Sequence, residues 1–446
     1  MDDFSAARNF ALSKSNGNWI LYLDADEQLN PDSVRELKTI INKQDKLGVN
    51  CTVTNLDDYS GNVRKMNYIR LFRNADKIHF EGKAHEQIQN SLVKSGYKIV
   101  QSKIEIVHHG YNLPKEELKH KAGRNLKLLL SDYEIKKNSY CAYQLANTYS
   151  VLDKREKALQ FYKEALRDKT LPVEYRFVCF LQLADNRMRN GDLKEARDLV
   201  KEGLAFDKTS INLMMLGSQI LGSLNNYSEA IKLCKGALKF NDSKLKNNSI
   251  NKNFDISINP QKILYQGLLL SLKGSDSKSF YLFLNELEKL NGERKFERTL
   301  ILELMNNKSI DKNDIDFLKN IIDDENLEFY LILLSSYNKQ QEKLSILNSL
   351  ENRFNSNSKY LVQIGLAYYE KNDLNKAQEY FELSFQQQEK DPPAVFYLAS
   401  IYLNTNNTNK LIKLIEFANT TFKDNRIVQE KLQVLIDKIK PLLENV

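Results

Sequence analysis

The stretch WILYLDADEQL, residues 19–29, decides the fold of the N-terminal part of the chain. Its first five residues form an apolar run of aromatic and β-branched character, which predicts a buried strand in a parallel sheet covered on both faces. The run ends in Asp24 and Asp26, and ligand sites in open α/β sheets lie at the carboxyl ends of strands. Carboxylates two residues apart point to the same side of an extended chain. Because Mg²⁺ and Mn²⁺ favour oxygen ligands, the pair can hold a divalent metal, but its spacing alone favours a solvated acidic turn, and the flanking residues decide between the two.

The composition indicates a globular protein of two or three domains. A chain of 446 residues is too long for one ordinary core. Its formal net charge of +7 is too small an excess to indicate nucleic-acid binding. No apolar run approaches the length of a membrane span, and the first residues lack a signal-peptide pattern. The four cysteines form no CxxC pair and are typical of reduced thiols. We therefore expect a cytoplasmic protein with no integral membrane segment.

The first 122 residues have the pattern of an α/β domain. Turn residues and changes of apolar period separate two helical segments from several short strands. Helices are predicted over 5–15 and from Asn30-Pro31 onward, and strands over 19–23, 49–54, 68–72 and 104–107. All five histidines lie in the first 120 residues, so the polar chemistry is expected there.

From Leu118 onward the apolar period is helical, and a repeat is visible. The sets with tetratricopeptide-repeat spacing are Leu145, Ala146, Tyr149, Ala158, Tyr162 and Ala165; Leu183, Ala184, Arg187, Ala196, Val200 and Gly203; Ile364, Gly365, Tyr368, Ala377, Phe381 and Ser384; and Leu398, Ala399, Tyr402, Leu411, Ile415 and Ala418. Small residues at these positions let two helices approach closely, and aromatic residues fill the gaps between repeats. We predict repeats over 123–240, a polar linker over 241–260, and further repeats over 261–446, degenerate to about 350 and clearer from 358.

Three segments of the first 125 residues resemble, in order, the nucleotide-sugar glycosyltransferases of family 2, which have the GT-A fold. The segments are DDFSAARNFALSKSNGNWILYLDADEQL (2–29), YIRLFRNADKIHFEGKAHEQI (68–88) and IEIVHHGY (104–111). The resemblance implies a partial GT-A domain over 1–122, followed by an all-α tetratricopeptide solenoid. It also implies sugar transfer from a nucleotide-diphosphate donor with Mn²⁺ or Mg²⁺ as the cofactor.

The resemblance assigns roles to residues of the first and second segments. Asp24 would lie toward the donor ribose and the metal, and Asp26 would bind the metal that spans the diphosphate. Glu86 would be the general base. In the alternative interpretation, Glu86 is only an acidic residue at the start of a helix running from 84 to about 95. His85 would orient Glu86 or line the acceptor cleft, or it is a packed histidine.

The same resemblance covers residues around the donor. His108 would be a further metal ligand or a diphosphate contact, and Gly110 would let the backbone turn beside the donor. Arg8 and Asn9 would support the donor pocket, with a helix-surface pair as the alternative. Arg70 and Arg73 could contact phosphate, or they could be exposed strand residues.

The chain departs from the family in one respect. The family places a βαβα nucleotide-binding half before the DxD motif, whereas only 23 residues precede Asp24. We therefore expect a chain that lacks this half and is inactive by itself.

The resemblance as a whole implies a metal-assisted, inverting glycosyltransferase. Solenoid repeats build concave surfaces that suit a peptide or protein acceptor. The alternative is a non-catalytic repeat scaffold that binds a protein partner, and a third interpretation is a metal-dependent phosphohydrolase built around the DxD. The sugar, the nucleotide, the acceptor and the oligomeric state stay open at this point.

Overall fold

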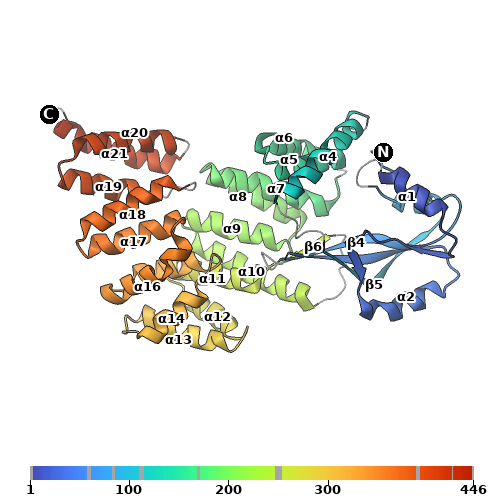
Figure 1. Cartoon of the computed structure of the whole chain (residues 1–446), viewed down its shortest axis with the longest axis horizontal. Helices are drawn as coiled ribbons and strands as arrows, with labels where there is room; N and C mark the ends of the chain where they lie inside the picture. Colours follow the sequence, from blue (N-terminus) through green and yellow to red (C-terminus); the bar gives the residue numbers. More distant parts are fainter. Residues whose placement is uncertain are drawn as a thin grey trace. The chain divides into compact units, whose positions relative to one another are not determined.

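The chain folds into two units, one comprising Met1–Met188 with Leu193–Pro260 and the other Arg189–Asp192 with Gln261–Val446. Figure 1 labels the helices and strands and colours them along the sequence. The computed structural model describes residues 4–57, 62–82, 86–109, 115–135, 137–167, 171–246, 254–387, 392–423 and 425–443. Among these residues, no helix combines the length and apolar character needed to cross a membrane.

The first unit contains a mixed sheet. Its strands are β1 (Trp19–Leu21), β2 (Glu27–Leu29), β3 (Leu47–Asp57), β4 (Asn62–Arg73), β5 (Lys98–His108) and β6 (Phe254–Ser257). The order is β1-β4-β3-β5-β2, with β6 also pairing with β4. Only β3 and β5 are parallel; the other pairs are antiparallel. The predicted parallel environment of the strand at 19–23 is therefore wrong: β1 pairs antiparallel with β4, and its side chains are only partly buried.

Helices cover both faces of this sheet. The flanking elements are α1 (Phe4–Ser13), the short 3-10 helix η1 (Pro31–Ser33), α2 (Val34–Ile41) and α3 (Gln89–Lys94). On one face, Ile40 of α2 packs with a buried cluster that includes Val49, Leu71 and Ile106. On the other face, Leu12 of α1 packs with a second cluster built around the fully buried Phe72. Alternate residues of β1 thus contribute to the two cores, Trp19 and Leu21 to the first and Ile20 to the second, as the period of two in a strand requires.

Helical repeats follow the sheet. The helices are α4 (Lys115–Ile135), α5 (Ser139–Val151), α6 (Arg155–Arg167), α7 (Val173–Arg189), α8 (Leu193–Phe206), α9 (Ile211–Ser223), α10 (Tyr227–Lys246), α11 (Pro260–Lys273), α12 (Ser277–Glu288), α13 (Glu293–Met305), α14 (Lys312–Ile321), α15 (Leu327–Ser335), α16 (Gln340–Phe354), α17 (Ser358–Glu370), α18 (Leu374–Gln386), α19 (Pro393–Asn404), α20 (Thr408–Thr421) and α21 (Arg426–Leu443). The fold class is therefore confirmed, as a small α/β part followed by a predominantly helical repeat structure.

The helices pair as the sequence spacing predicts. A Cβ atom added at Gly365 would lie 2.7 Å from the Phe381 ring, and one added at Gly267 would lie 2.6 Å from the Phe283 ring. These distances are too short for any residue but glycine, so the small residues mark the helix crossings. Residues with positive φ recur in the turns between helices: Asp153, Asn225, Ser275, Asn307, Asn372 and Asn406, at 51° to 64°, and Gly191, at 84°. A left-handed residue ends one helix and starts the next within a few residues.

The segment 241–260, predicted as a polar linker, contains ordered structure in its described part. Helix α10 continues to Lys246, and β6 pairs with residues Val63–Met66 of β4. The fully buried Asn241 donates to the carbonyl of Ile258 and accepts from its backbone N–H, both at 2.9 Å. The helical part of the first unit thus returns a strand to the sheet, which neighbouring sequence alone does not indicate.

Candidate functional site

Asp24, three residues beyond the end of β1, lies between two arginines. Nη2 of Arg8 is 2.7 Å from Oδ1 of Asp24, and Nη2 of Arg70 is 3.4 Å from Oδ2. Burial raises the pKa of Asp24, but the charges and hydrogen bonds of the two arginines outweigh it and hold the pKa below its ordinary value. Asp24 therefore stays ionised with both carboxylate oxygens engaged.

Arg70 is buried next to the ion pair of Arg8 and Asp24. Its side chain is 9% exposed, and its Nη2 donates at 2.5 Å to Oε1 of Glu27, which is 2% exposed. Oε2 of Glu27 accepts from the backbone N–H of Asp24 at 2.9 Å. The guanidinium also lies 4.7 Å from the centre of the Tyr22 ring. Arg70 is therefore not an exposed strand residue; with Glu27 it fixes the backbone that carries Asp24.

Tyr22 packs under both arginines. Burial raises the pKa of its hydroxyl to about 12, although Arg70 and Arg8 act in the opposite direction. The carbon of the Arg8 guanidinium lies 5.1 Å from the ring centre, a distance suited to a cation–π interaction. The ring thus supports both cations from the strand side.

Arg8 joins Asp24 to Glu86. Its Nε donates to Oε1 of Glu86 while its Nη2 bonds Asp24, so a single guanidinium connects carboxylates 62 residues apart in sequence. Glu86 precedes α3, which begins at Gln89, so the alternative in which it starts that helix does not hold. Two-point attachment orients both carboxylates toward the same guanidinium.

Helix α1 also holds the segment that leads to Glu86. The amide of Asn9 donates to the carbonyl of Phe80 at 3.0 Å and accepts from its N–H at 2.7 Å. The hydroxyl of Ser5 donates to the carbonyl of Gly82. Asn9 thus bonds protein backbone, and its amide positions the chain near Glu86.

Asp26 faces His108. Its Oδ2 lies 3.3 Å from Nε2 of the imidazole, and its carbonyl accepts from the N–H of His109 at 2.9 Å. The other ring nitrogen, Nδ1, is 2.6 Å from Oδ1 of Asn55. The pairing of β2 with β5 and the parallel pairing of β3 with β5 bring these residues together, because His108 is the register partner of both Glu27 and Asn55.

The structure therefore brings five predicted residues into two adjoining clusters. The first cluster consists of Arg8, Asp24 and Glu86, and the second contains Asp26 and His108. His85 and Gly110 lie outside the described residues. Sequence reasoning noted Glu27 as the residue that follows the motif in the family but gave it no role, and it missed Asn55, whose local signal is a polar side chain near the end of a strand.

A metal ion fits one of these clusters better than the other. Among the described residues, no group of three or more His, Cys, Asp and Glu side chains is arranged to hold a metal. Both oxygens of Asp24 bond arginines, whereas Asp26 is 43% exposed and lies beside His108, 20% exposed. A carboxylate oxygen suits a site completed by substrate phosphates and water, which is how Mg²⁺ is commonly held, and the imidazole nitrogen beside it is a further donor for a transition metal.

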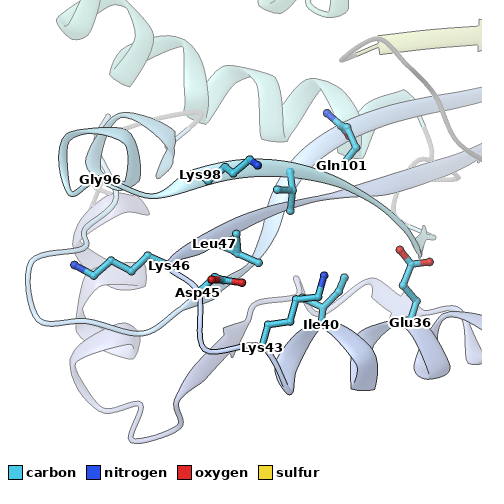
Figure 2. A pocket seen from close by; sticks show the side chains of 10 residues that line it. Glu36, Ile40, Lys43, Asp45, Lys46, Leu47, Gly96, Lys98 and Gln101 are labelled. Atoms are coloured by element: carbon cyan, nitrogen blue, oxygen red, sulfur yellow. The ribbon is translucent and has the colours of Figure 1, made fainter.

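A cavity of about 530 Å³ lies elsewhere on the sheet (Figure 2). It is bordered by Ile40 of α2, Leu47 at the start of β3 and Lys98 at the start of β5. Asn55 and His108 are at the opposite ends of the same two strands. The lining carries three lysines and two carboxylates, Lys43, Lys46, Lys98, Glu36 and Asp45. This cavity is separate from the clusters described above.

Comparison with known proteins gives two family matches. Residues 2–105 match the model of glycosyl transferase family 2, and residues 358–391 match that of a tetratricopeptide repeat. The first match contains Arg8, Asp24, Asp26 and Glu86, and it ends three residues before His108.

Two curated proteins are similar to parts of this chain. A TPR repeat-containing protein of Synechococcus elongatus is 29% identical over 212 residues, 46% of this chain and 52% of the relative. The prophage-derived glycosyltransferase SunS of Bacillus subtilis is 24% identical over 169 residues, 37% of this chain and 40% of the relative. The chain spans about half the length, or less, of these relatives.

A solved structure has been matched as well. A tetratricopeptide repeat protein from Parabacteroides merdae is 14% identical, with a TM-score of 0.42, and the match covers 66% of this chain and 97% of that one.

Proposed function

Because the N-terminal segment is that of a family 2 glycosyltransferase and helical repeats follow it, we propose that this protein acts in sugar transfer. The donor is a nucleotide-diphosphate sugar, and the acceptor is a hydroxyl or thiol of a peptide or protein. The convergence of Arg8, Asp24 and Glu86 beside Asp26 and His108 carries this proposal. We place the activity in the cytoplasm.

In this proposal Asp26 and His108 hold Mn²⁺ or Mg²⁺. When bound, the ion neutralises the negative charge that develops on the diphosphate leaving group. Asp24 has a different role: Arg8 and Arg70 already engage its oxygens, so it fixes the two guanidiniums at the donor end of the sheet. Glu27 anchors the turn between Asp24 and Asp26 through the backbone N–H of Asp24.

Glu86 is the proposed general base. Its carboxylate takes the proton from the acceptor hydroxyl or thiol while the acceptor atom forms a bond to the sugar carbon and the nucleoside diphosphate leaves. A single displacement of this kind inverts the configuration at that carbon. Arg8 bonds one oxygen of Glu86 and leaves the other oxygen available to the acceptor.

The repeats supply the proposed acceptor surface. Stacked helix pairs give an extended surface with many side chains of defined spacing, which suits a polypeptide. The pairing of β6 with β4 attaches the first repeats to the sheet that carries Arg70, so this part of the repeat array has a fixed position relative to the donor end.

A repeat scaffold without catalysis is the second candidate function. The ion pairs of Arg8 with Asp24 and Glu86 favour it, because a network of this kind also stabilises a fold. In that case the N-terminal sheet caps the helices and the repeats bind a protein partner.

Sugar transfer from a panel of nucleotide sugars to peptides, followed by mass spectrometry with Mn²⁺ present and with an N-terminal half from an intact family 2 enzyme added, separates these functions. Glu86→Gln keeps the shape and removes the proton acceptor, so transfer falls at least ~100-fold while nucleoside-diphosphate binding is retained. Glu81→Gln is the matched control, since Glu81 contacts the exposed His79 and Lys94 and should leave transfer unchanged. If donor binding falls in step with transfer, Glu86 is a binding residue. If the chain with this half added binds neither Mn²⁺ nor a nucleoside diphosphate, the scaffold is the better account.

A further inference from the structure

His108 is held between an amide and a carboxylate. Oδ1 of Asn55 is 2.6 Å from Nδ1 of the imidazole, and Oδ2 of Asp26 is 3.3 Å from Nε2. A neutral imidazole carries one N–H, and the partner of each nitrogen decides which nitrogen has it. An amide oxygen only accepts hydrogen bonds, so a contact of 2.6 Å with Oδ1 requires the hydrogen on Nδ1.

With the hydrogen on Nδ1, the lone pair of Nε2 faces the carboxylate of Asp26. In the neutral ring two acceptors, Nε2 and Oδ2, then lie 3.3 Å apart, and a cation can bind both of them; in the protonated ring Nε2–H donates to Oδ2 instead. The opposite tautomer would donate Nε2–H to Asp26, and its lone pair, on Nδ1, would face Oδ1 of Asn55 and not Asp26.

We propose that Asn55 is a positioning residue, which holds His108 in the Nδ1–H tautomer and turns the Nε2 lone pair toward Asp26. This inference rests on the proposed function, in which Asp26 and His108 receive the metal. Asn55 would contact neither the metal nor the substrate. It would determine that His108 offers the lone pair of Nε2 to the metal.

The surroundings of Asn55 favour this orientation of its amide. Asn55 is 4% exposed and lies on β3 between β4 and β5, directly opposite His108 in the parallel register. Its Nδ2 points toward Sδ of Met66 on the neighbouring strand at 3.8 Å, which uses the donor side and leaves Oδ1 toward the imidazole. Outer hydrogen bonds of this kind fix the tautomer and ring orientation of histidine ligands.

Nitrogen NMR of the full chain tests the tautomer directly. The protein is labelled with ¹⁵N-histidine, and the signal of His108 among five histidines is assigned with the His108→Gln variant. At a pH where the ring is neutral, the wild type is expected to show a protonated Nδ1 and an unprotonated Nε2. Asn55→Leu removes the acceptor and should move the proton to Nε2, where Asp26 accepts it. Asn55→Asp keeps an acceptor and should retain the proton on Nδ1.

Mn²⁺ binding, measured by electron paramagnetic resonance without any turnover, is the second readout. Asn55→Leu should weaken Mn²⁺ binding about 10-fold or more, whereas Asn55→Asp should not weaken it. Asn67→Leu is the matched control, because Asn67 is an equally buried amide of the same sheet that bonds Thr52 and Gln101 and not His108. A purely structural effect of losing a buried amide would weaken both leucine variants alike.

Three results would overturn the inference. They are a wild-type His108 protonated on Nε2, an unchanged tautomer in Asn55→Leu, and equal Mn²⁺ binding in the wild type and Asn55→Leu. The first result is measured on the wild type, so the inference can be tested even if a variant fails to fold. A wild type that binds no Mn²⁺ would contradict the proposed metal site, and the tautomer would still decide on Asn55.

Discussion

Replacing Arg70 by methionine should destabilise the sheet strongly. Methionine fills similar space but removes the guanidinium that bonds Glu27 at 2.5 Å and reaches Asp24 at 3.4 Å. Glu27 is then a carboxylate, 2% exposed, whose one remaining described hydrogen bond comes from the backbone N–H of Asp24.

The size of the effect follows from burial. Breaking a buried ion pair by removing one partner costs about 3–5 kcal/mol, because the other charge stays buried and uncompensated. The contact with the more exposed Asp24 adds little, since pairs near the surface contribute about 1 kcal/mol or less. With a urea dependence of roughly 2 kcal/mol per molar, the unfolding midpoint should fall by roughly 2 M.

Trp19 makes the measurement specific to the sheet. It is the one tryptophan of the chain and lies in β1, so its fluorescence during urea unfolding reports this part. Arg73→Met is the control, because Arg73 is on the same strand but bonds Gln44 and the carbonyl of Lys43 at the surface, at 3.1 and 3.5 Å. Arg73 also lies over the Trp19 ring at 5.8 Å, so midpoints and not intensities are compared.

The reasoning is refuted if Arg70→Met shifts the midpoint no more than Arg73→Met. A second variant sharpens the test. Adding Glu27→Gln to Arg70→Met removes the stranded charge and should restore a large part of the lost stability, because the cost comes from the unpaired carboxylate.

Three further predictions follow from the same structure. The pKa of Tyr22 is raised to about 12, so the stability that the buried neutral hydroxyl contributes is complete below pH 10 and is lost as the pH rises toward 12. Between these pH values Tyr22→Phe should lose less stability than the wild type, as measured by Trp19 fluorescence. An identical alkaline profile of the two proteins would contradict the burial of the hydroxyl. Glu297 is fully buried and accepts hydrogen bonds from Tyr265, Tyr330 and Arg294 at 2.5 to 2.6 Å. Glu297→Leu should therefore lower the free energy of unfolding by about 3–5 kcal/mol, measured by urea unfolding followed by circular dichroism, and adding Arg294→Met should recover most of the loss. Additive losses in the double variant would refute this account. The fragment 261–446 should fold by itself with a helical spectrum and a cooperative melt, since it makes up nearly all of the second unit. A fragment 126–446 would instead separate β6 from its partner β4. A strong strand signal or the lack of a cooperative melt for 261–446 would contradict the division of the chain into these two units.

The repeat structure was predictable from sequence because its determinants are local. Gly365 and Phe381 lie 16 residues apart, and the same small-and-large spacing recurs along the chain, so the pattern specifies the helix pairs without long-range information. The strand at 19–23 was found for a similar reason. Its antiparallel partner, β4, begins more than 40 residues later, and nothing in the apolar run itself distinguishes parallel from antiparallel pairing.

The site was predictable only in part. Arg8, Asp24 and Glu86 were named through the resemblance, and the structure adds the contacts that join them. Asn55 could not be found in this way, because its role depends on the register of two parallel strands more than 40 residues apart. His85 and Gly110, outside the described residues, stay predictions.

The return of β6 to the sheet illustrates the same limit. The residues around Phe254–Ser257 are rich in Asn, Lys and Ser, a composition typical of loops. Their strand forms because β4 offers an unpaired edge almost 190 residues earlier in the chain. Pairing of this kind is set by the sheet and not by the local sequence.

Calorimetric titration of nucleoside diphosphates, with and without Mn²⁺, tests the central claim most directly. The account predicts that the wild type, with an N-terminal half from an intact family 2 enzyme added, binds at least one nucleoside diphosphate in a Mn²⁺-dependent way. Asp26→Ala should weaken that binding about 10-fold or more while the sheet stays folded, because Asp26 is at the surface and supplies a metal ligand. Binding that ignores Mn²⁺, or that is equal in the wild type and Asp26→Ala, would contradict the assignment of this end of the sheet as a donor site.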